Sequence, residues 1–375
     1  MAVSLVSTGV TFPDNSTQTT AATGFGFKNR IINGAMVIDQ RNAGASVTNG
    51  YGPTVNYPVD RWALYGSQVT KCTGQRNAGT VTPPSGFTNY LGITSSSAYA
   101  VLTGDYFTTN QRIEGFNTAD LAWGTASAAT VTLSFWVRSS LTGTFGGSLS
   151  NNAFNRSYPF TYTISAANTW EQKSVTIAGD TTGTWATDNS IGIGVYFGLG
   201  VGATYSGTAG AWAAAGYFSA TGATSVVGTN GATFYITGVQ LEKGSTATSF
   251  DYRPYGTELA LCQRYYYRIV SEASFGRFGI ANNLSTTIAT AIVQYPVKMR
   301  AIPTALEQSG TAADYTILGT SSFTCSSVPV IGSSGTNTTY GTVNFTASGL
   351  TAGQASQCSS SSGVSTAYLG WSAEL

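Results

Sequence analysis

Short stretches of alternating apolar and polar residues recur along most of this chain, and they constrain its fold more than any other feature. The stretch from Val131 to Arg138 largely alternates, which is typical of a strand with one face on a core. Further strands are predicted at Ser174 to Ile177, Ile191 to Phe197 and Thr233 to Ile236, with Gly, Asn, Ser and Thr between them. Strands this frequent predict an all-β, two-sheet sandwich of the jelly-roll type over residues 27–256.

The rest of the chain predicts two smaller parts. One helix is expected, from Thr257 to Tyr265, with Thr257 as its N-cap. With this helix as a connector, residues 257–375 are predicted to form a small C-terminal β domain. Its strands are expected at Tyr265 to Ile269, Ile288 to Val297 and Ala367 to Leu375, and its serine-rich stretch from Ser359 to Gly363 is expected to be a loop.

Residues 1–26 are predicted to form a short N-terminal β segment. A strand from Val6 to Phe12 leads into the turn residues Pro13, Asp14 and Asn15, and the stretch from Ser16 to Thr20 is expected to return as a second strand. Such a hairpin is too small to be stable alone. It therefore needs other copies of the chain, or a larger particle, to pack against.

The charge content excludes several classes of function. Charged residues make up 9% of the chain and histidine is absent, which removes the usual general base of Ser-His-Asp and Cys-His enzymes. The net charge of +1 and the lack of a Lys/Arg run argue against nucleic acid as a partner. No apolar run is long enough for membrane insertion and no signal peptide is visible, so we expect synthesis in the cytoplasm.

The four cysteines give no sign of a metal or redox motif. Cys72, Cys262, Cys325 and Cys358 are scattered without CxxC spacing, so reduced structural residues are expected. Cys325 and Cys358 fall in the same terminal segment, and whether they pair after release into an oxidising medium stays open.

Two segments that bracket the first two thirds of the chain carry a family resemblance. The first runs from Lys28 to Asn42 and is followed by Val59-Asp60-Arg61-Trp62, and the second runs from Phe234 to Gly244 and is followed by Phe250 to Tyr255. This combination resembles the tail-fibre and related receptor-binding proteins of bacteriophages and prophages, whose central module is similar to jelly-roll carbohydrate-binding domains.

The resemblance implies a homotrimeric virion tail protein. Its N-terminus would attach to the tail or baseplate, and its body and C-terminal tip would adhere to host cell-surface polysaccharide without catalysis. The segment from Ser271 to Leu375, rich in Ser, Thr, Asn and Tyr, is expected to contact the host surface. Two alternatives remain open: a structural virion component, such as a capsid decoration or spacer, and a polysaccharide depolymerase.

Aromatic side chains are the candidate glycan-binding residues, because their rings stack on the apolar face of a sugar. The same residue types dominate cores and interfaces, so only their exposure distinguishes the two roles. The candidates are Trp123, Tyr158, Tyr162, Trp185, Trp212 and Tyr217.

No catalytic residue, cofactor or metal is predicted. A glycosidase needs two carboxylates in one cleft, and sequence spacing alone does not show whether two carboxylates lie that close. The carboxylates considered are Asp105, Glu114, Asp120, Glu171, Asp180, Asp188, Glu242 and Asp251. Jelly-roll sugar-binding modules often hold a structural calcium, and the matching residues Asn33, Gly34, Glu242 and Asp251 are weak candidates. Ala35-Met36 stands where an acidic residue often follows, and a site with few carboxylates binds calcium weakly.

Overall fold

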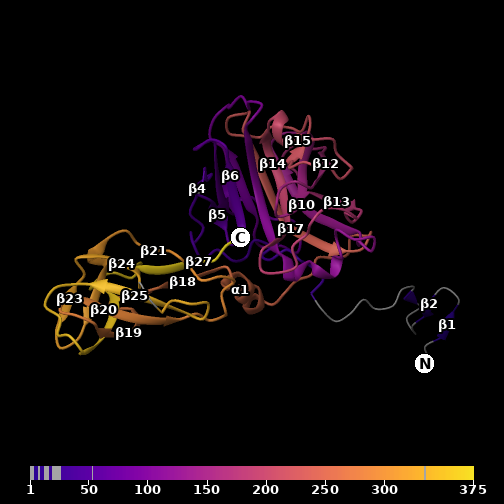
Figure 1. Cartoon of the computed structure of the whole chain (residues 1–375). Coiled ribbons are helices and arrows are strands. Elements are labelled where there is room, and N and C mark those ends of the chain that lie inside the picture. The colour runs from indigo at the N-terminus through magenta and orange to yellow at the C-terminus, as the bar shows by residue number, and fades with distance from the viewer. Residues whose placement is uncertain (1–3, 7–8, 12–16, 19–26, 53, 333–334) are drawn as a thin grey trace.

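The computed structural model is nearly all β, which confirms the predicted fold class (Figure 1). It describes residues 4–6, 9–11, 17–18, 27–52, 54–332 and 335–375. Two six-stranded sheets come from the first two thirds of the chain, and two further sheets come from its last third. No helix in this part of the chain combines the length and apolar character that crossing a bilayer requires.

The larger lobe is an antiparallel sandwich. Sheet 1 has the strand order β13 (Glu171–Ile177), β10 (Val131–Ser139), β17 (Thr233–Lys243), β8 (Leu91–Ser95), β7 (Cys72–Arg76) and β4 (Val47–Thr48). Sheet 2 has the order β12 (Ser157–Ile164), β11 (Gly143–Ser150), β14 (Ile191–Val201), β9 (Tyr106–Glu114), β6 (Trp62–Gly66) and β5 (Asn56–Val59). A short parallel pair, β15 (Ser206–Gly207) and β16 (Ser219–Ala220), adjoins them.

One apolar core fills the space between the two sheets. Phe197 on β14 of sheet 2 is in ring contact with Phe135 on β10 and Phe234 on β17, both in sheet 1. Strand β10 lies between β13 and β17, and its outward-facing Thr132 and Ser134 are buried as well. The alternation in the sequence therefore located the strand, although both faces of that strand are covered.

The single α-helix of the described residues begins earlier than predicted. Helix α1 spans Tyr255–Gln263, and Pro254 occupies its N-cap position. Thr257 lies inside the first turn and does not cap the helix. Proline has a fixed φ that suits the entry to a helix, so Pro254, three residues before the expected cap, determines the start. The described residues also form five short 3₁₀ helices: η1 (Ala78–Thr80), η2 (Gly115–Asn117), η3 (Ala119–Leu121), η4 (Ala203–Tyr205) and η5 (Ala312–Asp314).

The smaller lobe contains the two remaining sheets. A three-stranded sheet has the order β18 (Tyr266–Val270), β27 (Tyr368–Ser372) and β21 (Leu306–Gln308). A seven-stranded sheet has the order β23 (Ser322–Thr324), β22 (Tyr315–Leu318), β26 (Ala355–Ser360), β19 (Arg277–Asn283), β20 (Ile288–Gln294), β25 (Tyr340–Thr346) and β24 (Ser327–Ile331).

The prediction of a loop from Ser359 to Gly363 is wrong for its first two residues. Ser359 and Ser360 end strand β26, are buried, and pair with Thr316 and Tyr315 of β22. Pairing with a neighbouring strand has overridden the low strand propensity of serine. All four cysteines are free and buried, and Cys325 and Cys358 belong to the core of this lobe.

The N-terminal segment is described only in part. Strands β1 (Ser4–Val6), β2 (Gly9–Thr11) and β3 (Thr17–Gln18) form an antiparallel three-stranded sheet. The pairing of β2 with β3 agrees with the predicted hairpin, but Val6 belongs to β1 and pairs with Gly9, so the predicted strand from Val6 to Phe12 is not one strand. The turn residues and residues 19–26 lie outside the described residues.

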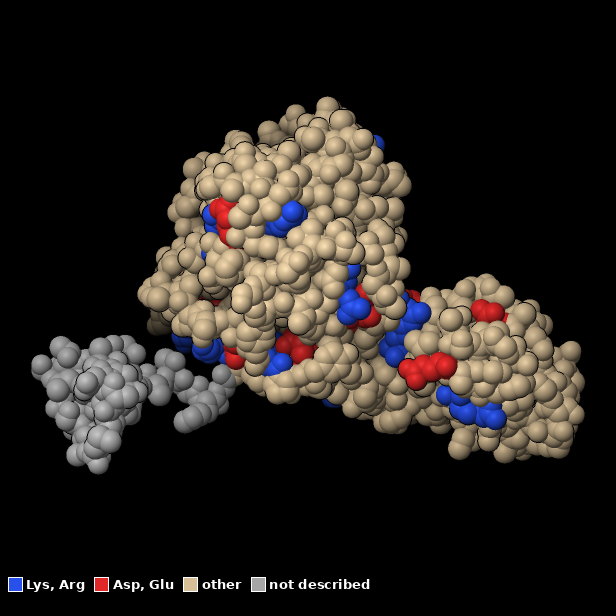
Figure 2. Space-filling view, turned by 180° about the vertical axis from the view of Figure 1, so that it is seen from behind, with Lys and Arg blue, Asp and Glu red and all other residues tan. Residues whose placement is uncertain are grey.

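Charged residues gather where the two lobes meet (Figure 2). Glu374, close to the end of the chain, forms ion pairs with Arg41 and Arg61 of the sandwich, and all three side chains are buried. The guanidinium groups of Arg41 and Arg61 lie over the rings of Tyr266 and Tyr265 at 3.5 and 3.6 Å. Arginines of the bracket segments are therefore paired where they are buried, as burial of a charge requires.

A second ion pair joins α1 to the sandwich. Arg264 donates two hydrogen bonds to the Glu114 carboxylate, and the Tyr265 hydroxyl donates a third. Arg112 donates to the main-chain oxygen of Leu375 at 2.6 Å. These contacts fasten the end of the chain to the sandwich, so the two lobes are held in one arrangement by charge-assisted bonds.

Candidate functional site

Four of the six candidate aromatic residues form one cluster. The rings of Trp123 and Trp185 lie 4.7 Å apart at 81°, and Trp212 lies 5.3 Å from Trp123 and 5.4 Å from Trp185. Tyr158 contacts Trp212 at 5.3 Å. Trp123 is buried and the other three are half-buried. Edge-to-face contacts of this kind stabilise aromatic clusters and fix the orientation of each ring.

The cluster is assembled from three connections between strands. Trp123 follows η3, Trp185 lies between β13 and β14, and Trp212 lies between β15 and β16. Only Tyr158 belongs to a strand, β12. Loops held by a rigid sandwich are a usual place for binding residues.

Asp180 fixes the loop that carries Trp185. Its carboxylate accepts two hydrogen bonds from Arg156, at 2.7 and 2.8 Å, and two more from the amide and hydroxyl of Thr182. Its carbonyl accepts the amide of Gly124 at 2.7 Å, which ties the Trp123 loop to the Trp185 loop. Burial favours the neutral acid, but the bonds from Arg156 and Thr182 outweigh it and lower the pKa of Asp180.

The three indole N–H groups are all satisfied within the protein. Trp123 donates to the carbonyl of Ala129, Trp185 to that of Thr182 and Trp212 to that of Ala178. These bonds hold the rings in place, and they leave only carbon surface to face outward.

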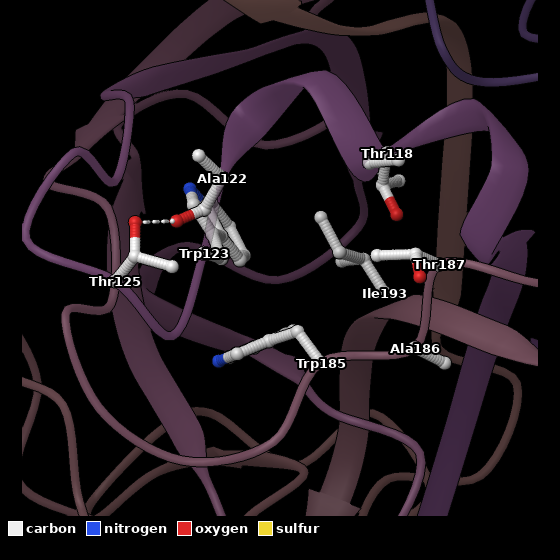
Figure 3. A pocket seen from close by; sticks show the side chains of 9 residues that line it. Thr118, Ala122, Trp123, Thr125, Trp185, Ala186, Thr187 and Ile193 are labelled. Atoms are coloured by element: carbon white, nitrogen blue, oxygen red, sulfur yellow. Dashed lines mark hydrogen bonds between the residues drawn. The ribbon is translucent and has the colours of Figure 1, made fainter.

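A cavity of about 220 Å³ opens beside the cluster (Figure 3). Trp123 and Trp185 form two of its walls, and the buried side chain of Ile193 from β14 lines it as well. The remaining lining residues are small or carry hydroxyl groups: Thr118, Ala119, Ala122, Thr125, Ala186 and Thr187. The sequence held no signal for these residues, because Thr and Ala are common throughout the chain.

Of the six candidates, Trp123 and Trp185 line this cavity, Tyr158 and Trp212 belong only to the cluster beside it, and two lie outside the cluster. Tyr162 belongs to the core of the sandwich, where it contacts Phe135 and Phe145, and burial raises the pKa of its hydroxyl. Tyr217 packs over Gly207, where a Cβ atom would approach its ring to 2.3 Å. Among the described residues neither contacts the three tryptophans, so their positions suit packing.

The eight carboxylates considered as catalytic candidates all accept hydrogen bonds within the chain, and none lines the tryptophan cavity. Hydrogen bonds from Ser190 lower the pKa of Asp188. For Glu171, burial acts in the opposite direction, but the bond from Lys173 and two amides lower its pKa. The general acid of a glycosidase instead needs a raised pKa.

The weak calcium candidates have protein partners for their oxygens. The Asn33 side chain bonds to the main chain of Ile38 and Asp60, and Glu242 accepts from Gln240 and Thr248. Asp251 accepts the amides of residues 28 and 29. No cluster of three or more Cys, Asp or Glu side chains is placed to hold a metal within the described ranges.

Gly34, the remaining residue of the calcium candidates, has a steric role. A Cβ atom at Gly34 would lie 2.2 Å from the carbonyl oxygen of Val239, while the Gly34 carbonyl accepts the amide of Val239 at 3.0 Å. The two backbones approach so closely that only glycine fits. The Asn-Gly pair of the bracket segment is therefore explained by packing and main-chain bonding.

A second aromatic cavity, of about 270 Å³, lies near α1. Phe87, Phe250 and Tyr252 are in mutual ring contact at 4.7 to 5.4 Å. Arg253 and Glu258 also line this cavity, and they form an ion pair with each other. Unlike the tryptophan cavity, this one carries charge.

Comparison with known proteins gives fold-level likeness only. No protein-family model and no curated protein matches the chain. Solved structures that match include the enzymatically active domain of tailspike protein 4 from bacteriophage CBA120, at 11% identity over 49% of this chain and 19% of that chain, with a TM-score of 0.29.

Carbohydrate-binding modules also match. A CBM4 structure shares 15% identity over 56% of this chain and 98% of that chain, with a TM-score of 0.29. The family 11 module from Clostridium thermocellum, in complex with a β-1,3-1,4-mixed-linked tetrasaccharide, shares 13% identity over 56% of this chain and 100% of that chain, with a TM-score of 0.28. Likenesses this weak assign no function, and the jelly-roll fold rests on the chain's own two sheets.

Proposed function

We propose that this chain is a receptor-binding tail-fibre subunit of a bacteriophage or prophage, which adheres to host surface glycan through the tryptophan cavity of its jelly roll. The observation that carries the proposal is the set Trp123, Trp185 and Trp212, held rigidly by their own N–H bonds beside an open cavity. Aromatic walls with a few hydroxyl groups are the chemistry that sugar rings require. The family resemblance of the bracket segments supplies the virion context.

The proposal predicts that Trp185→Ala weakens adhesion of the intact protein to host cells by roughly 10- to 30-fold, as expected for loss of an aromatic anchor. Binding is measured as saturation of bacteria, or of purified surface polysaccharide, by the labelled protein. Phe87→Ala is the matched control, because it removes one ring from the charged cavity and is expected to leave adhesion unchanged.

The opposite result would reassign the site. If Phe87→Ala abolished adhesion and Trp185→Ala did not, the cavity near α1 would be the binding site. If neither intact protein nor variants bound any host strain that the phage infects, the adhesion function itself would be wrong. Circular dichroism of each variant separates loss of binding from loss of fold.

Adhesion is proposed to occur without cleavage. The lowered pKa values of Asp180, Asp188 and Glu171 suit permanent carboxylates, which do not serve as general acids at neutral pH. Incubation with host polysaccharide should release no new reducing ends. Release that an Asp→Asn or Glu→Gln variant abolishes would make the chain a depolymerase.

The subunit is further proposed to be a homotrimer. On the seven-stranded sheet, Ile280 and Ile292 are 77% and 60% exposed, and their strand partners Gln357 and Thr342 are uncharged. Apolar residues side by side on an exposed sheet face suit coverage by other copies, and the exposed Arg277 nearby is hydrogen-bonded to Gln357. Light scattering should give a trimer for the native chain and a smaller species for Ile280→Asp/Ile292→Asp. Val69→Asp, at a 53% exposed position of the sandwich, is the control and should stay trimeric.

The two ends of the chain complete the proposal. Residues 1–26 would attach the fibre to the tail or baseplate, so their deletion should leave a folded protein that is missing from virions. Residues 271–375 stay a predicted region of host contact. Exchange of this region for that of a related fibre should redirect adsorption if the region carries the contact, whereas unchanged adsorption would leave recognition to the tryptophan cavity.

A further inference from the structure

The lining of the tryptophan cavity is entirely uncharged. Its nine residues are Thr118, Ala119, Ala122, Trp123, Thr125, Trp185, Ala186, Thr187 and Ile193. Asp120 and Asp188 adjoin lining residues in the sequence but are carboxylates, and the cation at the Trp185 loop, Arg156, is bound to Asp180. A carboxylated or phosphorylated sugar would lose its hydration here and gain no cation in exchange, which is unfavourable.

The two tryptophan walls make an apolar corner. The rings of Trp123 and Trp185 are in edge-to-face contact at 81°, and Ile193 lines the same cavity. The flat face of a pyranose ring stacks on one of the two aromatic rings. The second, perpendicular plane then faces the rim of the sugar, where ordinary hexoses carry hydroxyl groups.

A hydroxyl group placed in that corner would have no partner. Both indole N–H groups are already bonded to the carbonyls of Ala129 and Thr182. Leaving a buried hydroxyl without a hydrogen bond costs about 1–3 kcal/mol. A methyl group in the same place is favourable instead, by roughly 0.8 kcal/mol.

The polar side of the cavity is suited to the remaining sugar hydroxyls. The hydroxyl of Thr118 donates to the carbonyl of Gly115, which leaves its oxygen as an acceptor. Thr125 instead lies beyond Trp123, where its hydroxyl donates to Ala122 and accepts the amide of Ser127 (Figure 3). Thr187 is exposed, and within the described chain its hydroxyl has no hydrogen bond. A cavity of about 220 Å³ is large enough to hold one sugar unit.

We propose that the Trp123–Trp185 corner binds the methyl group of an uncharged terminal sugar, either a 6-deoxyhexose or an acetylated sugar. This inference rests on the proposed glycan adhesion and adds the class of glycan. Trp185 packs on the methyl group, and the Thr118 and Thr187 oxygens meet the ring hydroxyls on the other side.

The test uses the intact chain and matched pairs of sugars. The methyl glycosides of 6-deoxyglucose, 6-deoxygalactose and 6-deoxymannose are each compared with the parent hexose, and N-acetylglucosamine and glucuronic acid are compared with glucose. At least one methyl-bearing sugar should bind about tenfold or more tightly than its hydroxylated parent in calorimetric titration. Its methyl protons should receive the largest saturation transfer in NMR, and glucuronic acid should not bind.

Variants locate the effect and separate the acetyl from the deoxy source. Trp185→Ala should abolish the preference for the methyl-bearing sugar. Thr187→Ala should lower the affinity for both sugars of a pair alike, and Phe87→Ala should change neither the preference nor the affinity. If 6-deoxy sugars bind and N-acetylglucosamine does not, the methyl group is that of a deoxyhexose, and the reverse result identifies an acetyl group.

Other outcomes overturn the inference and leave adhesion standing. Equal binding of each pair, preference for glucuronic acid, or Trp185-dependent cell adhesion with no binding of any single sugar would each contradict a methyl-selective terminal site. Adhesion that no Trp185 change affects would move the site elsewhere. Absence of adhesion to any host would instead refute the proposed function itself.

Discussion

Replacing Glu374 with glutamine is expected to lower the free energy of unfolding by about 3–5 kcal/mol, because it leaves the buried Arg61 without an anionic partner. Arg41 and Arg61 both contact the Glu374 carboxylate, and all three side chains are less than a tenth exposed. Burial raises the pKa of the nearby Asp60 to about 6, although Arg41 and Gln40 oppose this rise. At neutral pH Asp60 is therefore mostly ionised and still pairs with Arg41 at 3.9 Å, so the loss of the Glu374 charge falls mainly on Arg61.

The effect is measured by chemical denaturation at neutral pH. Glu272→Gln is the control, since Glu272 is exposed, and surface changes of this kind alter stability by less than about 0.5 kcal/mol. If the smaller lobe unfolds separately in the Glu374 variant, two transitions should appear, and the shifted transition should belong to that lobe. Equal stability of the Glu374→Gln and Glu272→Gln proteins would show that the ion pairs contribute nothing to the junction.

The second large effect is expected from Phe197→Ala, which should destabilise the sandwich by about 3–5 kcal/mol. Phe197 is fully buried and contacts rings of both sheets, with Phe135 at 5.0 Å and Trp62 at 6.3 Å. Its removal leaves a cavity that neither sheet can close alone. Thermal or denaturant unfolding measures the change.

Phe116→Ala is the matched control, because Phe116 is 62% exposed and carries the same side chain. It should change the stability by less than about 0.5 kcal/mol. A similar loss of stability for both phenylalanine variants would contradict a single core shared by sheets 1 and 2.

Local pattern was sufficient for most of the strands. The alternating stretch from Val131 to Arg138 lies within β10, the stretch from Ile191 to Phe197 opens β14, and the stretch from Thr233 to Ile236 opens β17. A two-residue period is a property of neighbouring residues, so it is visible without knowledge of the fold. The boundaries were less predictable, as the early start of α1 at Tyr255 shows.

The candidate site was predictable only in its residue types. Trp123, Trp185 and Trp212 meet because three connections far apart in the sequence close over the same part of the sandwich. Tyr162, an equally good candidate in the sequence, points into the core instead. Nothing in the local pattern distinguishes these two outcomes.

The sequence by itself determined the all-β class, most strand positions, and the requirement that any buried arginine be paired, because these follow from local periodicity and from the cost of burying charge. Tertiary structure decided which partners meet. Glu374 reaches Arg41 and Arg61 across 333 and 313 residues of sequence separation, and Ser359 becomes a strand residue because β22 pairs with it. Such contacts depend on sheet order and loop closure, which involve residues distant in sequence and leave no periodic signal in either segment.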